Sequence, residues 1–129
     1  AWVSLGLQKP EIRVGNLAPK RDFSDVRDIV RGYCQVAEQG RPGRAYQLCS
    51  GKAVSIGTVL KTLTGFTSKE VRVTVDKDKL RKADIPVLRG SNRRAIEELG
   101  FEVRYRLKET LRDTFTWWQE RLTAQNRKG

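Results

Sequence analysis

The sequence has 129 residues, of which 38% are hydrophobic and 32% charged, and this balance fits a single globular domain with a polar surface. An excess of 26 lysines and arginines over 15 acidic residues gives a net charge of +11, which would attract nucleic acid or phosphorylated small molecules. The basic residues are scattered, without zinc-finger spacing or a basic tract interleaved with aromatics, and the absence of histidine excludes Ser-His-Asp and Cys-His chemistry within the chain.

The first elements are short. Residues 1–8 are interpreted as the tail of a helix that begins outside the chain, and Pro10 would end it. A short strand is predicted at 12–14, followed by a turn at Gly15-Asn16. Because the chain starts at Ala1 and contains no methionine, we expect it to be part of a longer protein.

A short extended stretch from Arg21 precedes the best-specified helix of the sequence. Asp25 is the candidate N-cap, with Asp28 as the second half of a capping box, and Gly40 is the predicted end. One helical stripe is formed by Val26, Ile29, Val30, Tyr33 and Ala37. The stripe predicts an amphipathic helix.

The middle of the chain alternates short strands with helices. A strand is predicted at 45–48, and Ser55 would cap a helix that ends at Gly65. The buried face of this helix is predicted to be Ile56, Val59, Leu60 and Leu63. Alternating valines at 71, 73 and 75 predict a half-buried strand.

The last third begins with irregular structure at 76–82 and an extended pair at 87–88. Ser91 or Asn92 would cap a short helix that ends at Gly100, with Ala95, Ile96 and Leu99 inward. A final helix from Lys108 to Leu122 would place Leu111, Phe115, Trp118 and Leu122 on one face. The fold class is therefore α/β, a small compact domain of short strands and about four helices.

Several kinds of site receive no support from the residues. The two cysteines, Cys34 and Cys49, lack metal-ligand spacing and are typical of a reducing cytoplasm, although a bridge between them stays open. No apolar run approaches the roughly 20 residues that a membrane-spanning helix needs. The sequence also contains no glycine-rich phosphate loop. We therefore expect no metal, no membrane contact, no cofactor bound by this chain alone, and no catalysis by it alone.

Five blocks of the sequence are similar to one enzyme family. They are Asn16-Leu17, the stretch RDFSDVRD from Arg21, YQLCSGKA from Tyr46, LRKADIP from Leu80, and Leu99-Gly100-Phe101. In this order they resemble the extended short-chain dehydrogenase/reductases that act on sugar nucleotides. The nearest branch contains GDP-mannose 4,6-dehydratase and GDP-4-keto-6-deoxy-mannose reductase. The blocks extend over nearly the whole chain, so residues 1–129 would form one substrate-binding domain.

The resemblance concerns only the carboxyl-terminal half of such enzymes. It implies that the Rossmann half, with its NAD(P) fingerprint and its Ser/Thr and Tyr-x-x-x-Lys catalytic residues, is absent from the chain. Tyr33, Tyr46 and Tyr105 each lack a lysine four positions later, so none matches the catalytic tyrosine. NAD(P) would then belong to the complete enzyme. Its other half, or a separate chain supplying it, would be a partner.

The resemblance also implies four substrate-binding residues. Arg21 matches the arginine of the family's R-D-[FW] motif, which contacts the diphosphate, and Arg81 matches that of the R-P-[AS]-[ED]-[VI] motif, which reaches the phosphates. Asp84 falls where the family has an acidic residue for the ribose hydroxyls, and Asn16 is a weaker match from V-G-N-L. Lys82 replaces the family's proline, which puts the nucleotide preference in question.

Each assignment has a structural alternative. Arg21 could pair with Asp22 or Asp25 instead of a ligand. Arg81 lies in a charged run typical of a solvated loop, and Asp84 could be a turn residue.

Three functions follow in order of preference. The first is the part of an NAD(P)-dependent sugar-nucleotide dehydratase, reductase or epimerase that holds the nucleoside diphosphate of a GDP-hexose. The second is a stand-alone, self-associating interaction module without catalysis. The third, well behind, is a nucleic-acid binder. Because an isolated half would expose its docking surface, we expect a two-fold dimer. Trp117, off the apolar face of the last helix, is either a second packing contact within the domain or part of such a surface.

Overall fold

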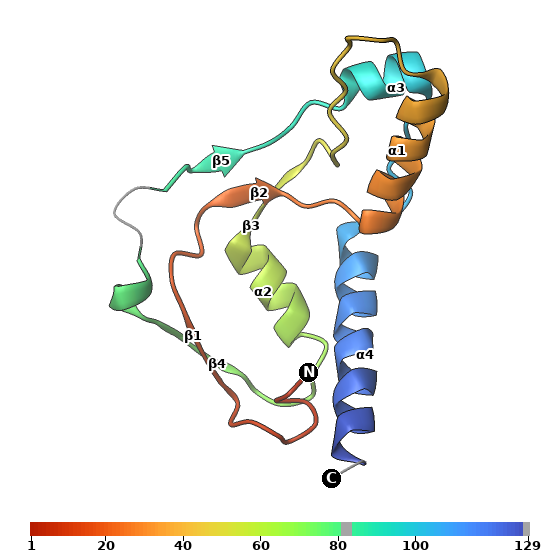
Figure 1. Cartoon of the computed structure of the whole chain (residues 1–129). Helices are drawn as coiled ribbons and strands as arrows, with labels where there is room; N and C mark the ends of the chain where they lie inside the picture. The colour runs from red at the N-terminus through yellow and green to blue at the C-terminus, as the bar shows by residue number, and fades with distance from the viewer. Residues whose placement is uncertain (81–83, 128–129) are drawn as a thin grey trace.

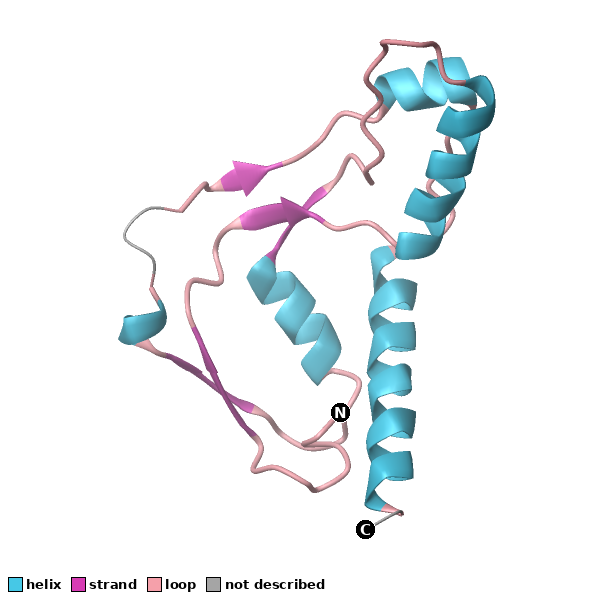
Figure 2. Cartoon of the chain, viewed as in Figure 1, coloured by secondary structure: helices cyan, strands magenta, loops and turns pink. Residues whose placement is uncertain are grey.

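The computed structural model describes residues 1–80 and 84–127, which form four α-helices, five short strands and one 3-10 turn (Figures 1 and 2). The strands are β1 (Glu11–Val14), β2 (Lys20–Asp22), β3 (Ala53–Ser55), β4 (Arg72–Val75) and β5 (Val87–Leu88). The helices are α1 (Val26–Gln39), α2 (Ile56–Thr64), α3 (Arg93–Leu99) and α4 (Leu107–Asn126), with the 3-10 turn η1 at Lys77–Lys79. The predicted α/β class and the small size of the sheets are confirmed.

The strands form two separate sheets. In the first, β2 is the middle strand, antiparallel to β3 with Lys20 opposite Ser55, and parallel to β5 with Lys20 opposite Val87. The second sheet is the parallel pair β1–β4, in which Glu11 lies opposite Arg72. Because β2 has a paired strand on each side, hydrogen bonds to both neighbours fix the position of its residues.

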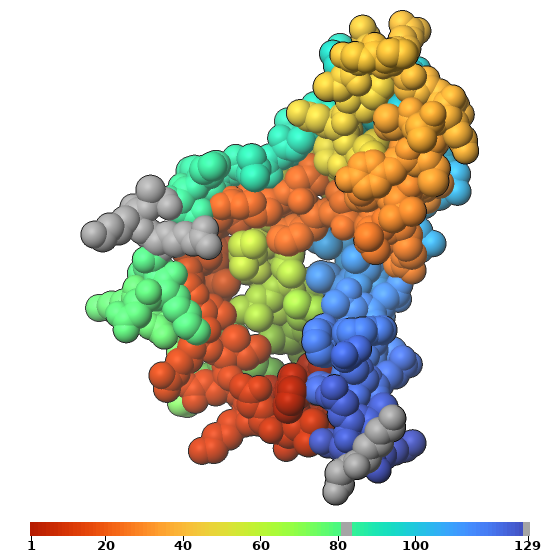
Figure 3. All heavy atoms as spheres, in the orientation of Figure 1, coloured from red at the N-terminus to blue at the C-terminus, as the bar shows by residue number. Residues whose placement is uncertain are grey.

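The apolar core is small and lies in two places. Phe101, Leu99 and Ala95 are buried where α3 meets α1. A Cβ at Gly32 would lie 2.9 Å from the Leu48 side chain and 3.0 Å from the Phe101 ring, so both side chains pack closely on α1 at this glycine. On the other side of the molecule α2 packs on α4, where Phe66 meets Phe115 edge-on with ring centroids 5.7 Å apart. Figure 3 shows the atoms of α2 between the β1 region and α4.

Helix α1 begins at the predicted residue, but its apolar stripe is largely exposed and its polar side is buried. The Asp25 side chain accepts from the Arg27 backbone N–H, which confirms the N-cap. Asp28 does not complete a capping box: it is 1% exposed and contacts the segment before α4. Three members of the apolar stripe, Val26, Val30 and Tyr33, are 69%, 53% and 65% exposed. Within this chain, the buried face of the helix is therefore the polar one.

Two predicted elements are absent, and the last helix is longer than predicted. Residues 1–8 form turns instead of a helix tail, with Gly6 at a positive φ of 76°. No strand forms at 45–48, where the carbonyl of Ala45 accepts from the Arg94 side chain; the strand β3 forms later, against β2. The last helix, α4, extends beyond the predicted range at both ends.

Some faces also differ from the expectation. On β4 the valines 73 and 75 are exposed, and Thr74 between them turns inward. Ile96 is exposed on α3, because only Ala95 and Leu99 reach the core from that helix. Trp118 is exposed beside Trp117, and the two rings meet edge-on with centroids 4.9 Å apart. Across the described part of the chain, every helix is too short or too polar to cross a membrane.

Candidate functional site

Arg21 lies in the middle strand β2 and joins it to the segment that leads into β5. Its Nη2 donates to Asp84 Oδ1 at 2.7 Å, and its Nη1 donates to the carbonyls of Lys20 at 2.8 Å and Ile85 at 2.7 Å. The two charged side chains are 27% and 22% exposed. Arg21 therefore pairs with neither Asp22 nor Asp25, the two partners that the sequence suggested.

A cavity of about 280 Å³ opens beside this ion pair. It is lined by Gly15, Asn16, Pro19, Arg21, Ile56, Lys79 and Asp84. Three of the four predicted binding residues thus meet in one cavity, although Asn16 and Asp84 are far apart in the sequence. The fourth, Arg81, lies outside the described residues.

Side chains supply the polar groups of this cavity. The Asn16 Oδ1 accepts from the Ala18 backbone N–H at 3.0 Å, which leaves the side-chain NH₂ as a donor. The first N–H groups of α2 are already used, since Ile56 donates to the Pro19 carbonyl and Gly57 to that of Leu17. Binding of an anion would therefore depend on Arg21 and its neighbours, with carboxylate and amide groups available for hydroxyls.

Asp22, the next residue of β2, was not singled out from the sequence. Its Oδ1 accepts from the Ser50 backbone N–H at 3.0 Å and from the Ser50 hydroxyl at 2.6 Å. Its Oδ2 accepts from the N–H groups of Gly51 at 3.0 Å and Gly90 at 3.3 Å. One carboxylate therefore fixes two loops to the end of the strand next to Arg21. Its place inside the R-D-F block was the signal that could have identified it.

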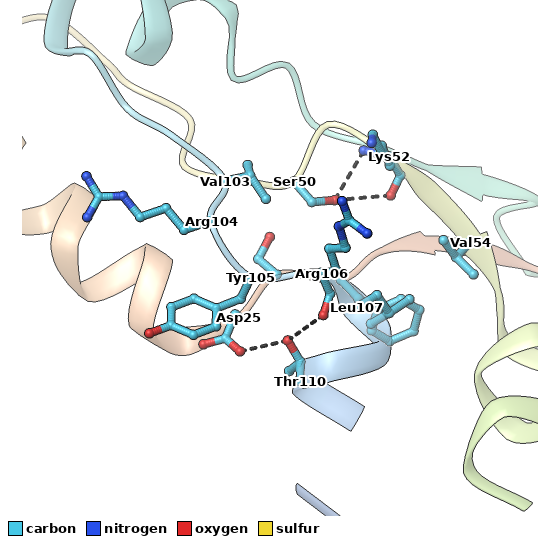
Figure 4. Close-up of a pocket in the computed structure, with 12 residues that line it drawn as sticks. Asp25, Ser50, Lys52, Val54, Val103, Arg104, Tyr105, Arg106, Leu107 and Thr110 are labelled. Atoms are coloured by element: carbon cyan, nitrogen blue, oxygen red, sulfur yellow. Dashed lines mark hydrogen bonds between the residues drawn. The ribbon is translucent and has the colours of Figure 1, made fainter. Parts of the chain in front are cut away.

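A larger cavity of about 460 Å³ lies beyond Asp22, the last residue of β2, and is lined by Phe23, Ser24 and Asp25 among others (Figure 4). Figure 4 shows the Arg106 side chain pointing toward Ser50 and Lys52, and the Asp25–Thr110 hydrogen bond lies below them. Of the three predicted residues that the structure describes, Asn16, Arg21 and Asp84, none lines this cavity.

Asp25 is the most strongly perturbed carboxyl group beside this second cavity. It accepts from Arg27 through the backbone N–H at 2.8 Å, Nε at 2.9 Å and Nη2 at 2.8 Å, and from the Thr110 hydroxyl at 2.7 Å. Arg27 also pairs with Asp113 at 2.8 Å and stacks 3.7 Å from the Tyr105 ring centroid. The hydrogen bonds from Arg27 hold the pKa of Asp25 well below its ordinary value.

Acid should therefore destabilise the chain through Asp25. The folded state lowers the pKa of this carboxyl below its ordinary value of 3.8, so the stabilisation is present above that pH and is lost as the pH falls further. The Arg44 guanidinium lowers the pKa of Glu98 and adds a change of the same sign. We expect the free energy of unfolding, measured by urea denaturation from neutral to acid pH, to depend less steeply on pH below about 4 in Asp25→Asn. An unchanged dependence in this variant would contradict the assignment.

Three comparisons relate the chain to known proteins. The family model described as GDP-mannose 4,6 dehydratase matches residues 1–114. The GDP-6-deoxy-D-mannose reductase of Pseudomonas aeruginosa is 29% identical over 125 residues, which are 97% of this chain and 41% of that protein. The GDP-mannose 4,6-dehydratase of Sinorhizobium fredii is 30% identical over 120 residues, 78% of this chain and 34% of that protein.

The fold is similar to solved structures of the same kind. The structure of RMD from Pseudomonas aeruginosa complexed with NADPH superposes with a TM-score of 0.87 and 28% sequence identity. The matched region is 93% of this chain and 39% of that one. The chain thus spans about two-fifths of the length of the first relatives that it matches.

Proposed function

The chain belongs to the GDP-mannose 4,6 dehydratase family, and from that premise we propose that it is the sugar-nucleotide-binding portion of an NAD(P)-dependent enzyme. Its ligand is a nucleoside diphosphate, GDP in the first instance, attached to a hexose. The observation that supports this most directly is the cavity in which Arg21, Asp84 and Asn16 meet.

The chemistry of the cavity suits a nucleoside diphosphate. A guanidinium has five N–H donors, and three hydrogen bonds of Arg21 end on Lys20, Ile85 and Asp84, so donors are left for phosphate oxygens. Asp84 uses Oδ1 for Arg21, which leaves Oδ2 to accept from ribose hydroxyls. The ion pair would thus hold both groups in fixed positions before the ligand arrives.

The hydride chemistry requires more than this chain. The sequence has no G-x-G-x-x-G fingerprint, so its residues do not fit a dinucleotide, and NAD(P) would be held by another part of the complete enzyme. The chemistry that NAD(P) would supply there is hydride transfer to and from the hexose. This chain's contribution is to hold the diphosphate so that the sugar faces the cofactor.

Calorimetric titration with GDP, GDP-mannose and UDP-glucose tests the proposal. We expect GDP and GDP-mannose to bind, and we expect Arg21→Ala to lower their affinity about thirtyfold. This is the typical effect of losing hydrogen bonds to a charged group. The matched control is Arg13→Ala, which removes an arginine on β1 whose side chain is 70% exposed and does not line the cavity. Both variants have the same net charge.

Two outcomes would contradict the proposal. One is that none of the three nucleotides binds to the wild-type chain. The other is that Arg13→Ala weakens binding as much as Arg21→Ala, since this would indicate nonspecific attraction by the net charge of +11. Thermal unfolding of both variants would show that each keeps its fold.

A second candidate function is a stand-alone interaction module. The exposed face of α1, formed by Val26, Val30 and Tyr33, favours it, because large apolar side chains grouped on one helix face usually contact a partner. The rest of the complete enzyme would cover this face in the first proposal. A second copy of the chain would cover it in the second.

A further inference from the structure

Lys79 lines the cavity of Arg21 and Asp84, and neither the motifs nor the comparisons assign it a role. It ends the turn η1, which follows β4 directly, and its Nζ donates to the Arg13 carbonyl of β1 at 3.0 Å. An ammonium group has three donors, so two of them are left after the bond to the Arg13 carbonyl.

Gly15 allows this position. A Cβ on Gly15 would lie 2.6 Å from the Lys79 carbonyl oxygen, a distance that the backbone could not accept without moving the turn. The turn η1 therefore lies directly against the end of β1, and the lysine side chain reaches from the turn to the Arg13 carbonyl of that strand. The placement of this cation is built into the backbone.

Lys79 brings to the cavity a positive charge that no neighbouring carboxylate of the described residues neutralises. The positive charge of Arg21 is compensated by Asp84 at 2.7 Å, so the pair is neutral as a unit. Within residues 1–80 and 84–127, no carboxylate lies within ion-pair distance of Lys79. A diphosphate has at least two negative charges, and Arg21 with its carboxylate partner does not balance both. Among the described residues that line the cavity, Lys79 is the other cation.

We propose that Lys79 is a specificity-determining residue of this cavity, which binds the second phosphate and so makes the site select nucleoside diphosphates over monophosphates. The proposal rests on the function proposed above and adds the residue that distinguishes one phosphate from two. Lysine serves here as a compact point charge, while the planar guanidinium of Arg21 orients the first phosphate.

The test compares GDP with GMP by calorimetric titration of wild type, Lys79→Ala, Lys79→Arg and Lys77→Ala. Lys77 is the matched control, because it starts the same turn, has the same charge and does not line the cavity. We expect Lys79→Ala to weaken the binding of GDP about tenfold and to change the affinity for GMP by less than about twofold. Lys79→Arg should keep most of the wild-type affinity for GDP. Lys77→Ala should leave both affinities close to those of the wild type.

The inference is wrong if Lys79→Ala leaves the affinity for GDP unchanged, or if it weakens GMP as much as GDP. It is also wrong if Lys77→Ala has the same effect as Lys79→Ala. In each of these cases the wild-type chain still binds GDP through Arg21, so the proposed function stands. If the wild-type chain binds neither nucleotide, the proposed function fails and this inference fails with it.

Discussion

Replacing Asp28 with alanine is expected to lower the free energy of unfolding by about 3 kcal/mol, because it breaks an ion pair with a buried carboxylate and leaves two backbone N–H groups without their acceptor. The carboxylate is 1% exposed. Its Oδ1 accepts from Arg31 at 2.7 Å, and its Oδ2 accepts from the backbone N–H groups of Arg104 at 3.1 Å and Tyr105 at 3.2 Å. This one side chain therefore holds the segment before α4 against α1.

The measurement is urea denaturation followed by circular dichroism. Glu38→Ala is the matched control, because it removes an exposed carboxylate from the same helix and should change the free energy of unfolding by less than about 0.5 kcal/mol. Asp28→Asn, which keeps one acceptor, should fall between the two. A loss in Asp28→Ala no larger than that in Glu38→Ala would contradict the prediction.

Placing aspartate at both Val30 and Tyr33 is expected to weaken self-association of the chain by about a hundredfold or more. These two side chains are exposed at successive turns of α1, and the predicted two-fold dimer would bury them against the same face of a second copy. Burial of unpaired carboxylates in that interface is costly, so the dimer should dissociate. Sedimentation velocity over a concentration series measures the effect.

The matched control places aspartate at Val73 and Val75, which are also exposed and apolar but lie on β4. If α1 is the interface, this second double variant keeps the wild-type dissociation constant. A wild-type chain that sediments as a monomer at every concentration would contradict the prediction outright. Equal loss in both double variants would place the interface elsewhere or make the association nonspecific.

Local features of the fold could be predicted because their causes are local. The Asp25 cap of α1, the Ser55 cap of α2 and the end of α3 at Gly100, with its φ of 64°, each depend on residues within one turn. The strands were harder to predict from the sequence. Residues 45–48 and 53–55 are both short and partly apolar, and only pairing with β2 selects the second of them.

In the site, too, the local motif could be predicted and the contacts between distant residues could not. The motif identified Asn16, Arg21 and Asp84, which do line one cavity. It could not supply the contact between Arg21 and Asp84, because a pair 63 positions apart depends on the pairing of β2 with β5. Lys79 was missed because it stands in a charged run, and its position depends on the close approach of the turn to Gly15.

The orientation of α1 was not predictable from its own residues. The stripe of Val26, Val30 and Tyr33 shows that one face is apolar, and an amphipathic pattern does not state which neighbour covers that face. In this chain the neighbours are α3 and the segment before α4. The segment donates to Asp28, and the Leu99 carbonyl at the end of α3 accepts from Gln35.

The parallel pairing of β1 with β4 also has a consequence for the order of events at the ribosome. Because Glu11 pairs with Arg72, the first strand leaves the ribosome without a partner and stays unpaired until the whole of α1 and α2 has been made. The middle strand β2 waits longer for β5. Contacts so distant in sequence slow folding, so β1 and β2 should lack these partners, and stay available to chaperones, until β4 and β5 have been made.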